Sequence, residues 1–151
     1  MLELANPLQR ETVNALARQV HDAHVSWRPD LYESTEELYP EARFLDHIRN
    51  RELFVARLEG MVVGYVLVKI REANSPGLCP RRVMMISEIC VDQDLRNHGI
   101  GTEMVSDVRV LAKAFRCTDL QLHVYPQNDE GVAFWQKCGF TIQNIQMQRK
   151  V

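Results

Sequence analysis

Residues Arg96–Gly101 read R-N-H-G-I-G, and they lie between an apolar run over Met84–Val91 and a helical repeat that begins at Thr102. A strand that turns through glycine into a helix presents several free backbone N–H groups at one point, with the positive end of the helix dipole behind them. Gly99 and Gly101 let the backbone approach an anion closely and tolerate a positive φ angle. This stretch therefore predicts a strand, a phosphate-binding turn and a helix.

Two other glycine-rich phosphate loops do not fit. The dinucleotide fingerprint G-x-G-x-x-G requires a third glycine where Met104 stands. The P-loop requires G-K-[ST], whereas Gly101 is followed by Thr102 and Glu103. The pattern that does fit is R-x-x-G-x-G, with a second group of residues downstream: Asn128, Ala133-Phe134-Trp135 and Gly139-Phe140.

With these two motifs the chain resembles the GNAT superfamily of acyl-CoA N-acyltransferases. The pyrophosphate loop of that family is [RQ]-x-x-G-x-[GA], and its later motif is N-x-x-A-x-x-[FL]-Y-x-x-x-G-F. The resemblance is close over Ile86–Phe140 and looser elsewhere. It implies an α/β fold with a mixed central sheet of about six or seven strands and helices on both faces. It also implies an enzyme that uses acetyl-CoA as co-substrate, without a metal, and acetylates a primary amine of a small molecule or peptide.

Length and composition agree with a single catalytic domain over residues 1–151. The chain has 46% hydrophobic residues, enough for one substantial core, and a net charge of −2, which disfavours a nucleic-acid partner. No secretory leader or long apolar segment is visible, so we expect a cytoplasmic protein without a membrane partner. A homodimer is left open. The cysteines lack a C-x-x-C pair and are interpreted as reduced thiols: Cys79, Cys90, Cys117 and Cys138.

The hydrophobic periodicity predicts the elements in the order β-α-α-β-β-β-α-β-α-β. In the first half we expect a strand over Leu2–Ala5, helices over Leu8–His24 and about Ser34–Arg49, and a hairpin of Leu53–Leu58 with Met61–Ile70, joined at Glu59-Gly60. In the second half we expect a strand ending at Val91, a helix from Gly99 to Phe115, an alternating strand over Leu120–Tyr125, a helix capped by Asn128, and a last strand over Phe140–Met147.

The resemblance implies a set of cofactor contacts. The backbone of Ile89, Cys90 and Val91 would hold the pantetheine arm where two strands splay apart, and would polarise the thioester carbonyl. Arg96 would add a positive charge, and Asn128 and Trp135 would reach the cofactor from the second motif, where Asn128 also caps its helix. The pyrophosphate would lie on the backbone of six residues: Asn97, His98, Gly99, Ile100, Gly101 and Thr102.

Glu88 interrupts the apolar run V-M-M-I-S-E-I-C-V, and an ionised carboxylate in a central strand needs a partner or a purpose. An amine of pKa about 10.4 must lose a proton before it attacks, at a cost of roughly 4 to 5 kcal/mol at neutral pH. We interpret Glu88 as the base that removes this proton. The alternative is a structural salt bridge with Arg28 or Arg43. His123 and Tyr125, on the polar face of the strand beside the cofactor, are further catalytic candidates.

The segment after the first helix is expected to form the acceptor pocket, with His24 lining it and Arg28 or Tyr32 recognising an acceptor carboxylate. His21 and His24 are three residues apart, but without a third ligand we do not interpret them as a metal site.

The chain departs from the family motif at two positions. Trp135 stands where the family has the tyrosine that protonates the CoA thiolate, and an indole cannot deliver that proton. Gly131 replaces an alanine, at a cost in helix propensity. Two alternatives therefore stay open: an acyl-CoA-binding module that has lost catalysis, with Trp135 as the mark of it, and a protein N-terminal acetyltransferase. If the protein is an enzyme, Tyr125 is the candidate to replace the missing acid.

Overall fold

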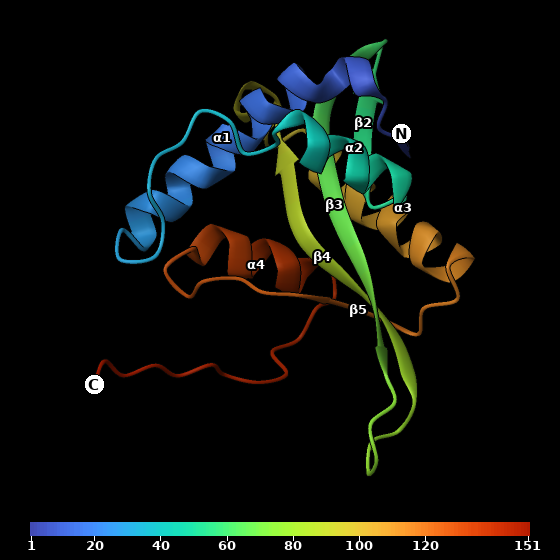
Figure 1. Ribbon diagram of the computed structural model, residues 1–151, viewed down its shortest axis with the longest axis vertical. Coiled ribbons are helices and arrows are strands. Elements are labelled where there is room, and N and C mark those ends of the chain that lie inside the picture. The colour runs from blue at the N-terminus through green and yellow to red at the C-terminus, as the bar shows by residue number, and fades with distance from the viewer.

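The computed structural model describes all residues from Met1 to Val151, arranged around one twisted sheet (Figure 1). The strands are β1 Leu2–Leu4, β2 Leu53–Leu58, β3 Met61–Ala73, β4 Arg81–Val91 and β5 Asp119–Leu122. The helices are α1 Arg10–Trp27, α2 Glu41–Arg49, α3 Ile100–Ala114 and α4 Asp129–Lys137. Short 3₁₀ turns precede α1 and α3, over Pro7–Gln9 and Gln93–Leu95. No helix is both long enough and apolar enough to cross a bilayer.

The sheet has the strand order β1-β2-β3-β4-β5. The first four strands pair antiparallel, and β4 pairs with β5 in parallel. A parallel neighbour requires a crossover, and α3 provides it. The expected mixed sheet is confirmed, but the expected six or seven strands are wrong, because the sheet has five.

The missing strand is the one predicted over Phe140–Met147. The amide of Phe140 still donates to the carbonyl of Trp135 and closes α4, but residues 141–151 make no backbone–backbone hydrogen bond. The alternating sequence is compatible with a strand, yet a strand forms only beside a second strand, and this segment leaves the body of the domain (Figure 1).

The helix predicted over Ser34–Arg49 begins later than expected, at Glu41. Pro40 is its N-cap, with an extended ψ of 152° that ends the irregular segment before it. That segment is fastened to α1 by side chains: Asn14 bonds both backbone groups of Tyr39, and Arg18 donates to the carbonyl of Glu36.

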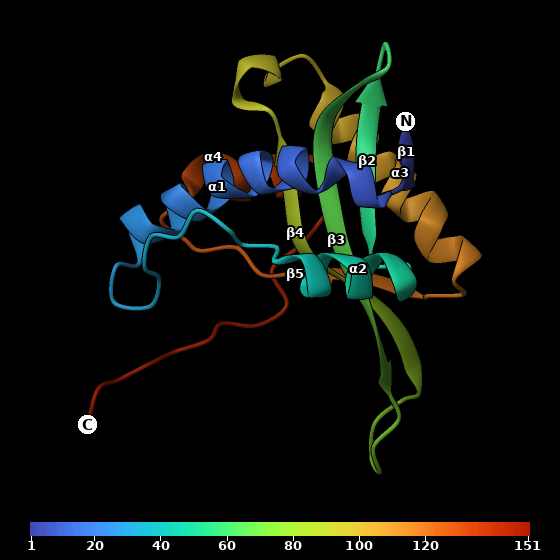
Figure 2. The ribbon, with the colours of Figure 1, turned by 45° about the horizontal axis from the view of Figure 1, so that its top comes forward.

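Helices cover both faces of the sheet, as expected, and each pair of helices buries its own core (Figure 2). Alternation along β2 and β3 sends side chains to opposite faces. Phe54 and Val66 pack with Met104 and Val108 of α3, whereas Val55 and Tyr65 pack toward α1 and α2. Trp135 brings α4 into the α3 core.

Gly64 lets β3 and β4 approach at the point where α3 packs on them. A Cβ atom there would lie 2.5 Å from the carbonyl oxygen of Cys90 and 3.0 Å from Sδ of Met104. We expect Gly64→Ala to lower the free energy of unfolding by about 1 to 3 kcal/mol through overpacking, as measured by urea denaturation. Gly101→Ala is the matched control, because its Cβ would meet a ring carbon of Phe134 at 3.3 Å. A stability loss in the control equal to that in Gly64→Ala would contradict the assignment.

Candidate active site

A bulge in β4 shapes the site. Leu67 of β3 pairs with Glu88 and Val68 pairs with Ile86, so Ser87 is an extra residue on β4. The extra residue reverses the alternation of side chains. Met84 and Ile86 face the α3 core before the bulge, whereas Cys90 faces the α1 core after it. Glu88 shares the face of Cys90, because the two residues are two positions apart on the same strand.

The parallel pairing of β4 with β5 ends at the same bulge. Its last pair joins Ile86 to Leu122, so beyond Ser87 only β3 accompanies β4. The amide of Asp92 donates to the carbonyl of Val63 on β3. In an antiparallel pair the backbone groups of successive residues point alternately toward and away from the partner strand. The backbone groups of Ile89 and Val91 therefore point away from β3. Ile89 and Val91 are two of the three residues predicted to contact pantetheine. Their backbone groups therefore face the side of β4 where β5 no longer pairs with it.

Cys90, the third of these residues, has its backbone turned toward β3 by the same alternation. Its side chain is buried, and Sγ donates to the carbonyl of Leu16 at 3.4 Å. Burial raises the pKa of the Cys90 thiol to about 11. The thiol is therefore a packing group at neutral pH and not a nucleophile.

The predicted turn between β4 and α3 is present. Asn97 and Gly99 both have positive φ angles, of 64° and 83°. Gly99 is the N-cap of α3, and no side chain caps this helix, so the first backbone N–H groups are left for another partner. Gly101 packs against the Phe134 ring of α4, and Nε of Arg96 donates to the carbonyl of Val91 at 3.1 Å. His98 is exposed.

Asn128 caps α4 as expected, with Oδ1 accepting from the amide of Gly131 at 2.9 Å. A Cβ atom at position 131 would lie 2.2 Å from Nδ2 of Asn128. Gly131, in place of the family alanine, thus leaves space for the conformation in which the Asn128 side chain caps α4.

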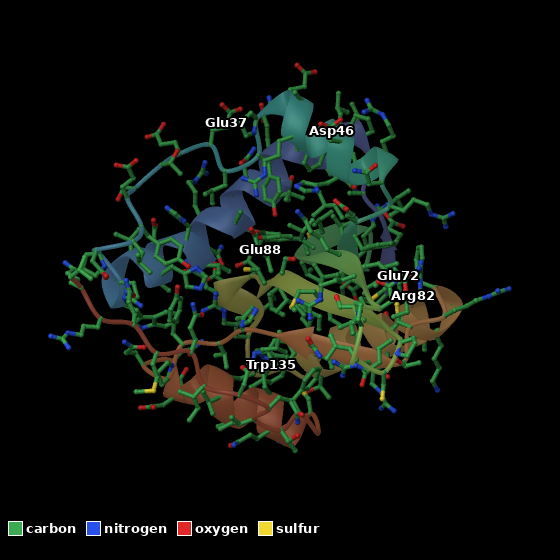
Figure 3. All side chains as sticks on the ribbon, turned by 60° about the horizontal axis from the view of Figure 1, so that its bottom comes forward. Glu37, Asp46, Glu72, Arg82, Glu88 and Trp135 are labelled. Atoms are coloured by element: carbon green, nitrogen blue, oxygen red, sulfur yellow. The ribbon has the colours of Figure 1, made fainter.

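Glu88 is held by two tyrosines. Its Oε2 accepts from the hydroxyl of Tyr39 at 2.6 Å and from that of Tyr65 at 2.8 Å, in the space between β4 and α1 (Figure 3). Oε1 of the half-buried Glu88 has no hydrogen-bond partner and is not sealed from solvent. One carboxylate oxygen is anchored and the other is available to a substrate or a water molecule.

The alternative salt bridge for Glu88 is wrong. Arg28 pairs with Asp30 at 2.7 Å, and Arg43 donates to the carbonyl of Leu38 with its guanidinium over the Tyr39 ring. Burial, and next the charge of Glu88, raises the pKa of both Tyr39 and Tyr65 above the usual value. Both hydroxyls therefore stay protonated and remain donors to the carboxylate.

Several residues predicted separately form one aromatic group at the end of α1. His24 stacks on Tyr32 at 5.2 Å between ring centroids and meets Tyr125 edge-on at 5.9 Å. The hydroxyls of Tyr32 and Tyr125 are 2.8 Å apart, and the guanidinium of Arg28 lies 5.8 Å from the Tyr125 ring. The hydrogen bond between Tyr32 and Tyr125, and next burial, raises the pKa of Tyr32 to about 12.

His24 is electrostatically coupled to the catalytic candidate Glu88. Burial lowers the pKa of His24, although the charge of Glu88 acts in the opposite direction. At neutral pH the imidazole is therefore uncharged. Neither ring nitrogen of His24 has a hydrogen-bond partner, and neither is sealed from solvent.

Two predicted residues lie elsewhere than expected. His123 is exposed and makes no hydrogen bond, because β5 ends at Leu122 and the alternation that would have aligned it with Tyr125 stops there. Trp135 is 9% exposed within the α3 core, with its ring edge-on to Phe134 and Phe140 at 5.0 and 5.2 Å.

Tyr39 and Tyr65 were not among the predicted site residues. Tyr65 reads as one more apolar position of the β3 run, and Tyr39 lies inside the segment that was expected to be helical. The sequence does contain one signal for them. A buried carboxylate requires hydrogen-bond donors, and tyrosine is a residue that can place a hydroxyl donor inside a hydrophobic core.

The chain is similar to known proteins in sequence and in fold. Residues 18–140 match the model of the acetyltransferase (GNAT) family. N-alpha-acetyltransferases from Sulfurisphaera tokodaii and Sulfolobus acidocaldarius are 28% and 29% identical over 112 residues, which cover 69% of this chain and 66% of each relative.

Solved structures are also similar. A mutant protein from Bacillus halodurans is 27% identical with a TM-score of 0.93, over 100% of this chain and 99% of that chain. The aminoglycoside N-acetyltransferase AAC(6')-Iy, in complex with CoA, has a TM-score of 0.72 and 17% identity, over 100% of this chain and 99% of that chain, and shows likeness of fold alone.

The tyrosine anchor of Glu88 can be tested through stability. Removing the Tyr65 hydroxyl leaves a partly buried carboxylate with one donor fewer, so Tyr65→Phe should cost about 1.5 to 3 kcal/mol in urea unfolding. Most of this loss should disappear in a Glu88→Gln background, where the charge is absent. Tyr125→Phe is the control, because it removes only a neutral hydroxyl pair. An equal cost with and without the Glu88 charge would argue against the anchor.

Proposed function

This chain belongs to the acetyltransferase (GNAT) family, and we propose that it transfers an acetyl group from acetyl-CoA directly to a primary amine of a small molecule or peptide. One observation carries the proposal: Glu88 has one oxygen anchored by Tyr39 and Tyr65 and the other open, beside the strand edge that β5 leaves unpaired. A base and a backbone edge suited to a thioester arm thus lie next to each other.

The residues present fit acetyl-CoA, which would supply the acetyl thioester. The uncapped start of α3 and the positive φ angles of Asn97 and Gly99 suit the pyrophosphate. The guanidinium of Arg96 adds a positive charge at the same loop. The backbone of Ile89 and Val91 would bind the amides of the pantetheine arm as an added strand would.

Proton removal from the amine is assigned to Glu88. Its open Oε1 would take the proton directly or through one water molecule, while the two tyrosine hydroxyls hold the carboxylate in place. His24, uncharged and open at both ring nitrogens, lies on the acceptor side together with Arg28 and Tyr32. This group would line the acceptor pocket.

Protonation of the leaving thiolate has no dedicated group at position 135, since the Trp135 ring is packed in the core. A thiol of pKa about 8.5 leaves tolerably near neutral pH without help. Tyr125 would be the nearest substitute acid, with its hydroxyl held by Tyr32. His123, exposed and without a partner, has the weaker support.

The α-amino group of a peptide is the first acceptor to test. Two relatives carry the name N-alpha-acetyltransferase, and they match this chain over most of its length. Small amines remain the alternative. A panel of peptide N-termini, polyamines and aminoglycosides, assayed by CoA release, would identify the acceptor class.

Acetyl-CoA binding is the first functional prediction. We expect acetyl-CoA to raise the melting temperature, because a ligand that binds the folded state alone stabilises it. Gly99→Glu should abolish this shift by placing a negative charge at the phosphate turn. Gly77→Glu is the matched control: its φ of +84° is close to the +83° of Gly99, both positions have open space around a Cβ, and Gly77 lies at the tip of the β3–β4 hairpin. Absence of a shift in the wild type would refute the proposal.

Glu88 provides the second functional prediction. Glu88→Gln keeps an oxygen for the two tyrosines but removes the base, so turnover should fall about 100-fold or more while the acetyl-CoA dissociation constant stays nearly unchanged. Steady-state assays with the amine found in the panel would measure this. Glu72→Gln, an exposed glutamate of the hairpin, is the control. Equal turnover in wild type and Glu88→Gln across a pH series would leave Glu88 with a structural role only.

A further inference from the structure

We propose that the acceptor is bound as a cation and has no carboxylate on the carbon next to its amine, and that Asp30 enforces this choice by occupying Arg28. The inference rests on the proposed acetyl transfer, because it concerns the acceptor of that reaction. It divides the candidate acceptors into two classes. Peptide N-termini and simple amines fit the site, whereas free amino acids do not.

Arg28 is the cation next to the aromatic group at the end of α1, and the protein already binds it. Nε of Arg28 donates to Oδ1 of Asp30 at 2.9 Å, and Nη2 donates to Oδ2 at 2.7 Å. These are the two parallel bonds that a guanidinium offers to a carboxylate. Nη2 also donates to Oε1 of Gln148 at 3.2 Å. Asp30 therefore takes the edge of Arg28 that a carboxylate of the acceptor would need.

The pair of Arg28 and Asp30 is built into a backbone turn. The amides of Leu31 and Tyr32 both donate to the carbonyl of Arg28 at 3.0 Å, which closes the chain around the two charged residues. The hydrogen bond from Arg28 lowers the pKa of Asp30 to about 2, so its carboxylate is charged at neutral pH. The pair is thus present before an acceptor arrives, and its two charges cancel.

With this pair neutral, Glu88 gives the acceptor side of the site its negative charge. His24 is uncharged at neutral pH, because burial lowers its pKa, and it stacks on the Tyr32 ring. Faces of aromatic rings attract cations, and the guanidinium of Arg28 already lies 5.8 Å from the centre of the Tyr125 ring. An ammonium group is therefore attracted to this side, whereas a carboxylate is repelled.

The position of the carboxylate in an amino acid decides which acceptors are excluded. The amine and the carboxylate of an amino acid are attached to the same carbon, so both must approach Glu88 together. In a peptide N-terminus an uncharged amide replaces that carboxylate, and in a simple amine a hydrogen atom does. Only these last two classes bring a positive charge to Glu88 without a negative one beside it.

The test compares matched pairs of ligands that differ in the carboxylate: phenethylamine with phenylalanine, and methionine amide with methionine. Each is titrated calorimetrically into the protein in the presence of CoA, which has no acetyl group to transfer. Binding is thus measured separately from the proposed reaction, whose own failure would be the absence of CoA release from acetyl-CoA with every amine. We expect the carboxylate-free member of each pair to bind about tenfold more tightly or better.

Asp30→Asn tests the role of Asp30 directly. It frees the guanidinium of Arg28, so the affinity for phenylalanine and methionine should rise about tenfold and the preference should shrink. Adding Arg28→Gln to this variant should restore the preference. Asp46→Asn is the matched control, because it breaks an exposed pair with Arg49 on α2 and should leave the preference unchanged.

Three results would overturn the proposal. The first is a wild type that binds phenylalanine as tightly as phenethylamine, or that binds neither amine-only ligand. The second is an unchanged preference in Asp30→Asn, with a melting temperature that shows the variant is folded. The third is an equal loss of preference in the control Asp46→Asn.

Discussion

The extra residue Ser87 in β4 is the constraint on which the rest of the site depends. At this bulge the parallel partner β5 ends, and the alternation of side chains is reversed. If β4 ran through Ser87 as a regular strand, without the bulge, Glu88 would share the face of Met84 and Ile86 and enter the apolar α3 core. With it, the carboxylate faces Tyr39 and Tyr65. One irregularity thus places the Glu88 carboxylate between the two tyrosines and leaves a strand edge unpaired.

The buried charge is tolerated because two hydroxyls solvate one of its oxygens. Both tyrosines belong to the α1 core, and Tyr39 is tied to α1 through Asn14. Glu88 is therefore positioned by two buried tyrosines of a packed core, and this gives it a defined geometry. Oε1 of Glu88 has no hydrogen-bond partner and is not sealed from solvent, so the carboxylate keeps one oxygen for a further hydrogen bond.

The two glycines of the turn between β4 and α3 have different physical roles. Gly99 supplies a left-handed backbone at the start of α3, with open space around it. Gly101 instead allows the Phe134 ring of α4 to approach α3 closely. The first role serves the free N–H groups of the turn, and the second ties the turn to α4, whose cap is Asn128. The two motifs recognised in the sequence are thus in direct contact.

Local sequence determined the glycine turn before α3, the order of most elements, the cap at Asn128 and the presence of an anomalous glutamate in an apolar strand. These features depend on neighbours a few residues apart, where periodicity and capping rules act. Tertiary structure alone decided the partners of Glu88, the grouping of His24 with Tyr32 and Tyr125, the exposure of His123 and the absence of a strand after Phe140. Each of these depends on a bulge, on a strand end or on contacts between distant segments. Such long-range contacts leave no signal in a single stretch of sequence, because the free energy that selects them comes from packing and strand pairing.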